Sequence, residues 1–218
     1  MFEILCVGNY IMNSQYKKES QEDILNYWFG ELREGEMPSG DYYKIWFAKR
    51  IEIDEYIKNN FEEDLKCAIE GKLKSWENTP RGTLALIILL DQFSRNIYRG
   101  TAKAFSQDSL ALDVCLRGIE KGFDKRLHPV ERLFLYMPLE HSEDLEIQKK
   151  SVEYFSVLEK TFTSTPSLVS IISEFKNYAE KHYVIIERFG RFPHRNEVLG
   201  RESTPQEIEF LKQPGSSF

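Results

Sequence analysis

Apolar residues recur at intervals of three and four from about residue 20 to residue 212, a spacing typical of helices with one buried face. Glycine and proline separate the periodic segments, because glycine ends helices and proline begins or interrupts them. We expect an interruption near Asp54 in the segment from Tyr42 to Ile69, and a kink or end near Pro138 in the segment that begins at Pro129. The other predicted helix starts are Ser20, Pro80, Ser106, Ser142, Pro166 and Pro205.

One predicted helix is apolar on every side. Thr79 and Pro80 form its start signal, an N-cap followed by proline at the first helical position, and the apolar run Leu84 to Leu90 follows. A helix without a polar face is buried on all sides. We therefore expect this helix at the centre of the fold.

The pattern as a whole predicts an all-α fold, since no segment alternates apolar and polar residues as a strand does. We expect a single domain of about nine helices over residues 20–212, packed as antiparallel pairs. Residues 1–19 are predicted to be an N-terminal extension and residues 213–218 a C-terminal tail. No clean repeat near 34 residues is visible, so the sequence pattern does not distinguish a helix bundle from a short solenoid.

Composition narrows the class of protein. Of the 218 residues, 41% are hydrophobic and 13% aromatic, which excludes a disordered or collagen-like chain. The formal net charge of −6 argues against a general nucleic-acid coat. The longest wholly apolar run, Leu84 to Leu90, is far shorter than the roughly 20 residues of a membrane span. No transmembrane helix is therefore expected.

The cysteines and the first residues indicate a cytoplasmic protein. Cys6, Cys67 and Cys115 lie far apart and are odd in number, so we expect free thiols in a reducing compartment. The start of the chain lacks the pattern of a secretory signal, because Glu3 precedes only a brief apolar stretch.

The first polar block, Asp91 to Arg99, directly follows the apolar run. Asp91, Arg95 and Arg99 are spaced at four residues and are expected on one helix face, with Gln92 and Asn96 beside them. One interpretation is a polar wall in which Asp91 orients Arg95 toward a carboxylate or phosphate. The alternative is a purely structural ion pair at the end of the helix.

The second block, Arg188 to Arg201, carries a local charge of +3 in an acidic chain, from four arginines and one glutamate. Its glycines and Pro193 predict a loop, and loops on a rigid scaffold commonly hold ligands. The alternative is a solvated loop whose arginines bind nearby acids and helix carbonyls. The candidate ligand-binding residues of this block are Arg191, His194, Arg195 and Asn196.

A third set of polar residues supports these blocks. Glu140 and His141 are expected on a bend after Pro138, where they can form an acid and base pair or an ordinary hydrogen-bonded loop. His182 lies on an apolar stripe and is expected to be a satisfied core residue more often than a site residue. His141, His182 and His194 could in principle hold a metal with Glu143 or Asp144, but their spacing is not that of a compact metal motif. P-loop, dinucleotide-binding and hydrolase-elbow motifs are absent. No metal or cofactor is expected.

Several short motifs occur along the chain: LNYWFG at 25–30, TPRG at 79–82, LDQFSRNIYR at 90–99, GRFPHRNEVLG at 190–200, Met137 to Glu143, His182, and Arg201 with Ser203 to Glu207. Together they resemble the uncharacterised bacterial family called domain of unknown function 924, over about residues 22–212. The resemblance implies an all-helical, tetratricopeptide-like array of helices and implies no reaction. Residues 1–19 depart from it, since the family begins close to the first helix; they are either a tail or sequence before a true start at Met12.

Two functions remain open at this point. In the first, the two arginine blocks meet at a pocket that binds a small anionic ligand, with or without turnover. Its expected lining is Arg95, Asn96, Arg99, His141, Arg191, His194, Arg195 and Asn196, supported by Asp91, Gln92, Glu140 and His182.

In the second, the protein is a tetratricopeptide-like interaction module without catalysis that holds a partner peptide. RNA binding is a weaker third reading, because the net charge argues against a wide footprint. Enzyme activity and oligomeric state are not predicted.

Overall fold

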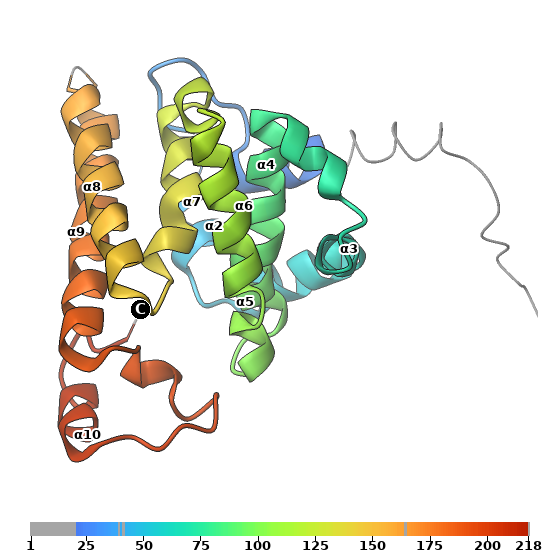
Figure 1. Ribbon diagram of the computed structural model, residues 1–218. Helices are drawn as coiled ribbons and strands as arrows, with labels where there is room; N and C mark the ends of the chain where they lie inside the picture. Colours follow the sequence, from blue (N-terminus) through green and yellow to red (C-terminus); the bar gives the residue numbers. More distant parts are fainter. Residues whose placement is uncertain (1–20, 39, 41, 164, 218) are drawn as a thin grey trace, which may run out of the picture.

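The structure is a computed structural model that describes residues 21–217 except 39, 41 and 164, and its regular secondary structure is helical (Figure 1). A first helix spans residues 21–29. After it come α2 Tyr42–Phe47, α3 Ile51–Ile69, α4 Pro80–Ile87, α5 Ser94–Ile97, α6 Asp108–Glu120, α7 Pro129–Glu140, α8 Leu145–Thr161, α9 Pro166–Phe189 and α10 Pro205–Leu211. A π-helical segment, Ile88–Phe93, joins α4 to α5. Short 3₁₀ segments lie at Lys74–Asn78, Ala102–Phe105, Asp124–Arg126 and Pro193–Arg195.

The predicted fold class is confirmed. No β-strand occurs in the part of the chain that the structure describes, and the helices form one domain with short connections. The helices α8 and α9 are an antiparallel pair, and α7 lies between this pair and the group formed by α4 and α6 (Figure 1). On the other side, α3 packs against the π-helical segment and α5.

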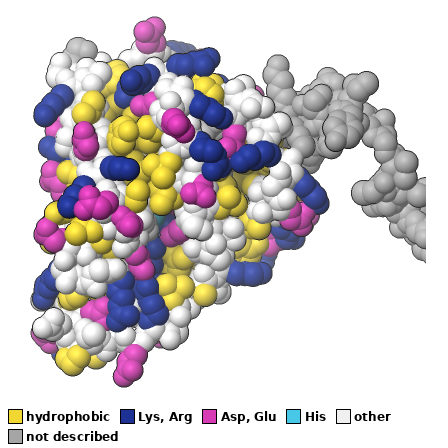
Figure 2. Space-filling view, in the orientation of Figure 1, with side chains coloured by type: hydrophobic (Ala, Val, Ile, Leu, Met, Phe, Trp, Pro, Cys, Tyr) yellow, Lys and Arg dark blue, Asp and Glu magenta, His cyan; other side chains and the backbone are white. Residues whose placement is uncertain are grey.

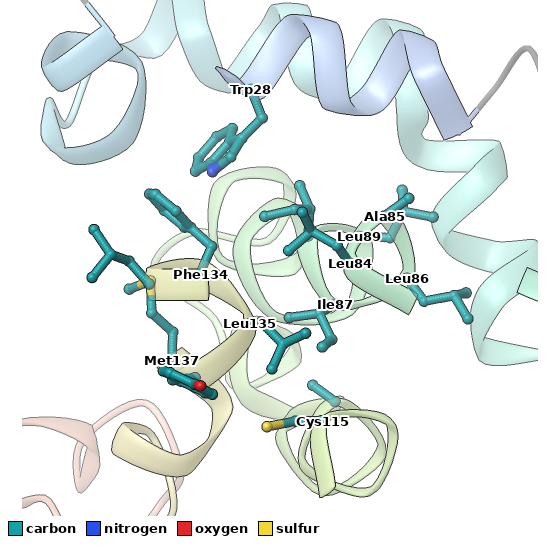
Figure 3. Packing of buried hydrophobic residues seen from close by; sticks show 14 of the residues in the cluster. Trp28, Leu84, Ala85, Leu86, Ile87, Leu89, Cys115, Phe134, Leu135 and Met137 are labelled. Carbon is teal, nitrogen blue, oxygen red and sulfur yellow. The ribbon is translucent and has the colours of Figure 1, made fainter. Parts of the chain in front are cut away.

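The central helix is the one that the apolar run predicts. Every residue from Leu84 to Leu90 is buried. Trp28, Phe134 and Leu135 lie around this run, and Cys115 of α6 lies on a further side (Figure 3). The first polar block follows at the C-terminal end of this run, where Asp91 and Gln92 are still buried.

Most of the helix boundaries follow the predicted signals. The Thr79 hydroxyl accepts from the Gly82 amide at 3.1 Å, so it caps α4. Thr204 and Glu207 form the capping box at the start of α10. Gly190 ends α9 with φ of 68°, in the left-handed region that glycine adopts without strain. The cap expected at Ser20 lies outside the described residues.

Two boundary predictions differ from the structure in position, and the first is the interruption expected near Asp54. The chain between α2 and α3 leaves the helix at residues 48–50, and Asp54 lies in the first turn of α3, where a carboxylate is favoured by the helix dipole. Asp144, and not Ser142, caps α8: its Oδ1 accepts from the Ile147 amide at 3.0 Å. The Ser142 hydroxyl instead accepts from the Asp144 amide at 3.2 Å and shapes the preceding turn.

The helix α7 ends at Glu140, two residues after Pro138, so the end predicted near Pro138 is confirmed, although the helix does not stop at the proline itself. The helix continues to Glu140, and the His141 amide still donates to the Met137 carbonyl at 3.0 Å. Proline removes one hydrogen bond, but α7 is buried from Leu133 to Glu140, and packing on both sides holds its last turn in place. Glu140 and His141 therefore stand at the end of a rigid helix and not on a bend.

Two other expectations concern thiols and membranes. Cys67 and Cys115 are free thiols, and Cys6 lies outside the described residues. Among the described helices, none is both long enough and apolar enough to cross a membrane.

Gly82 provides a test of the packing at the start of α4. A Cβ atom there would lie 2.3 Å from the Trp76 carbonyl oxygen and 2.8 Å from Thr79 Oγ1. Alanine is favoured over glycine in a helix by about 1 kcal/mol, but overpacking typically costs about 1–3 kcal/mol. We expect Gly82→Ala to lower the free energy of unfolding measured with urea, and a variant more stable than the wild type would contradict this packing.

Candidate functional site

A cavity of about 600 Å³ lies where the two polar blocks meet. Arg95, from the first block, and Arg195, from the loop after α9, both contribute to its wall. The end of α7 and the middle of α9 complete its polar side. Of the predicted residues, the cavity is lined by Gln92, Arg95, Asn96, Arg99, Glu140, His141, His182, His194 and Arg195.

Asp91 is the buried anchor behind this wall. The π-helical turn carries its carboxylate out of the apolar helix but not into solvent, since its side chain is 0% exposed. Arg95 Nη1 lies 3.2 Å from Asp91 Oδ1 and His141 Nδ1 lies 2.7 Å from the same oxygen, while Gln92 Nε2 donates to Oδ2. Burial opposes ionisation, but Arg95, His141 and Gln92 hold the pKa of Asp91 well below its usual range.

Asp108, at the start of α6, connects the two arginine blocks. Arg95 donates to both of its carboxylate oxygens, at 3.0 and 3.1 Å, and Arg195 Nη1 donates to Oδ2 at 3.1 Å. Two guanidinium groups can approach each other only with an anion between them. The sequence analysis missed Asp108, because nothing in the local sequence distinguishes it from any other acid in the first turn of a helix.

Arg195 is the most deeply enclosed cation of the wall. Its guanidinium lies 4.7 Å from the ring centre of Phe105 and 4.4 Å from that of Phe192, and the residue is 5% exposed. Nη1 also donates to the His141 carbonyl at 3.2 Å, whereas the buried Nε has no hydrogen-bond partner. Burial, followed by repulsion from Arg95, lowers the pKa of Arg195 to about 10.

Glu140, His141 and His182 form a compact buried cluster beside Asp91. His182 Nδ1 lies 2.8 Å from the Tyr178 carbonyl, to which it donates, and 3.1 Å from Glu140 Oε1. Burial and the nearby Asp91 charge raise the pKa of Glu140 to about 8. Burial lowers the pKa of both histidines, so the imidazoles are neutral near pH 7.

Arg99 and Asn96 stand at the rim of the cavity and are tied to α3. Arg99 donates to the two oxygens of Asp54 at 2.6 and 2.7 Å, and Asn96 donates to Asp54 at 2.8 Å. The spacing of four residues predicted Arg99 on one helix face with Asp91. This is wrong for Arg99, because α5 ends at Ile97 and Arg99 lies in the following turn.

The remaining wall is aromatic, and the chain end contributes to it. The aromatic residues that line the cavity are Tyr43, Trp46, Phe47, Phe105, Phe175 and Tyr178, and Lys49 and Glu174 line it as well. Ser217 also lines the cavity and Ser216 is buried, so this part of the predicted tail lies against the domain.

The structure does not place Arg191 or Asn196 at the cavity. Arg191 donates to both carboxylate oxygens of Glu207, at 2.7 and 2.8 Å. Asn196 donates to the Ser203 hydroxyl at 3.0 Å and accepts from Arg201 at 3.0 Å. Both side chains hold the loop after α9 in shape, as the alternative interpretation of this block describes. His194 does line the cavity, and burial together with Arg195 lowers its pKa to about 4.

The role of Asp91 can be tested by removing its carboxylate. Asp91→Ala leaves Arg95 partly buried with one anion fewer and deprives His141 of its acceptor, so we expect a loss of about 3 kcal/mol in unfolding free energy. Glu209→Ala, which breaks the exposed ion pair with Lys212, is the control, with an expected cost below about 1 kcal/mol. If the two variants lose the same unfolding free energy in urea, the buried Asp91 carboxylate does not stabilise the fold more than an exposed ion pair does.

Comparison with known proteins agrees with this architecture. A solved structure described as a protein of unknown function, ATU0120, from Agrobacterium tumefaciens superposes with a TM-score of 0.76 at 31% sequence identity, covering 90% of this chain and 98% of that one. A search of curated proteins found no match at the significance level applied. The family model described as bacterial protein of unknown function (DUF924) matches residues 24–215, and the chain therefore belongs to that family.

Proposed function

We propose that the cavity binds a small organic anion whose carboxylate or phosphate group accepts hydrogen bonds from Arg195. The observation that supports this most strongly is the state of that guanidinium, which is 5% exposed and has an Nε without an acceptor. A buried donor without a partner costs about 1–3 kcal/mol, and more when it is charged. An anionic ligand that reaches Nε would remove this cost.

The local charges support the same ligand class. Arg95 and Arg195 share the single carboxylate of Asp108, and the charge of Asp91 is also hydrogen-bonded by His141. A second anion beside Arg195 would reduce the repulsion between the two guanidinium groups. Guanidinium recognises carboxylate and phosphate through paired hydrogen bonds, which gives such a site its selectivity for planar or tetrahedral oxyanions.

The aromatic wall indicates what the rest of the ligand resembles. Trp46, Phe47 and Phe175 also line the cavity. A volume of about 600 Å³ lies within the range of small-molecule sites. We infer an amphipathic ligand with one anionic group and an apolar or aromatic body. The proposal concerns binding, and no reaction is part of it.

The alternative function is a tetratricopeptide-like interaction module without catalysis. It is supported by the pairing of several arginines with acids from other elements, such as Arg99 with Asp54 and Arg191 with Glu207. In that case the polar blocks tie helices together and a partner peptide binds in the cavity. Nucleic acid remains a weak candidate, because basic and acidic side chains are interspersed on the face shown in Figure 2 and the net charge is −6.

The test uses benzoate and phenyl phosphate as probes, measured by isothermal titration calorimetry. We expect Arg195→Ala to weaken the binding of whichever probe binds the wild type by about 10- to 150-fold, the equivalent of about 1.5–3 kcal/mol for a charged hydrogen bond. Arg195→Lys keeps the charge but loses the planar fork, so it should restore only part of the affinity.

Arg191→Ala is the matched control, because Arg191 belongs to the same loop but lies outside the cavity. It should bind the probes as the wild type does. If neither probe binds, or if both arginine variants bind equally, the interaction module becomes the better account.

A further inference from the structure

We propose that Glu140, His141 and His182 form a binding site for a divalent transition-metal cation of the Zn²⁺ type on the inner wall of the cavity. One potential ligand atom from each of the three side chains lies within 4.8 Å of the other two. All three residues are more than nine-tenths buried. Two imidazoles and one carboxylate are a ligand set that zinc and related metals accept in open, three-ligand sites.

The hydrogen bonds of the two histidines set which ring nitrogen each of them would offer to a metal. The Nδ1–H group of His141 donates to the Asp91 carboxylate at 2.7 Å, and that of His182 donates to the Tyr178 carbonyl at 2.8 Å. Each bond fixes the tautomer in which the lone pair is on Nε2. A carboxylate or backbone carbonyl behind the imidazole is the usual outer partner of a metal-bound histidine, because it orients the ring and increases its basicity.

Glu140 provides the third ligand. Its Oε2 atom is buried and has no hydrogen-bond partner, although Oε1 lies 3.1 Å from His182 Nδ1. A buried carboxylate oxygen without a donor is unusual in a folded protein. A cation bound between the carboxylate and the imidazoles would satisfy it.

The surrounding charges permit a cation despite the two arginines. Arg95 and Arg195 are offset by Asp91 and Asp108, so an ionised Glu140 leaves the group of five with a net charge of −1. Three protein ligands leave coordination positions open toward the cavity for water or for an anion. The sequence predicts no metal site here, because residues 140, 141 and 182 do not have the spacing of a compact metal motif.

The direct test is titration of the full chain, first stripped with a chelator, with ZnCl₂ and with CoCl₂. We expect one equivalent to bind with a dissociation constant in the micromolar range or below, and Co²⁺ to give the visible absorption of a low-coordinate site. Glu140→Gln and His182→Ala should each weaken binding at least 10-fold, after circular dichroism has shown that each variant is helical. If His182→Ala does not fold, the Zn²⁺ affinity of the near-isosteric variant Glu140→Gln tests the proposal.

Two controls separate this site from other possibilities. His194→Ala removes a histidine of the same cavity that lies outside the cluster and should bind Zn²⁺ as the wild type does. Arg195→Ala should lose the organic anion but retain the metal, so the two proposals can fail independently. Absence of Zn²⁺ binding to the wild type would overturn the proposal. So would equal binding by wild type, Glu140→Gln and His182→Ala, which would indicate a different zinc site.

Discussion

The cavity depends on one constraint, the burial of the Asp91 carboxylate at the end of an otherwise apolar helix. An ion excluded from water costs several kcal/mol unless donors surround it. Asp91 meets this requirement with Arg95, His141 and Gln92, which contribute a guanidinium, an imidazole and an amide. Each of these side chains is thereby fixed in one orientation, and each of them lines the cavity.

A chain of ion pairs continues outward from this anchor. Arg95 also binds Asp108 at the start of α6, and Asp108 binds Arg195 from the loop after α9. Segments that are about a hundred residues apart in sequence are thus joined through two carboxylates. The arrangement satisfies the charges but leaves the Nε of Arg195 and the Oε2 of Glu140 without partners. Those two atoms are the reason for proposing an anion and a cation as ligands of the same cavity.

Local signals in the sequence predict where helices begin and end better than they predict which residues of different helices come into contact. The start of α4 follows the signal of Thr79 and Pro80, and the end of α9 follows Gly190, because capping acts within one turn of the helix. The pairing of Asp91 with Arg95 follows from their spacing of four residues. Asp108 could not be found this way, since its partners come from distant segments, and the continuation of α7 through Pro138 reflects burial that no local rule describes. Likewise, the role of Arg191 depends on its pairing with Glu207, sixteen residues further along the chain.

A double-mutant cycle between Asp91 and Arg95 tests the central claim most directly. The unfolding free energies of the wild type, Asp91→Ala, Arg95→Ala and the double variant would be measured in urea under one buffer condition. If the buried carboxylate and the guanidinium stabilise each other, the double variant should lose at least about 1 kcal/mol less than the sum of the two single losses. Losses that add to within about 0.5 kcal/mol would contradict the account, because they would show that the two charges are satisfied independently.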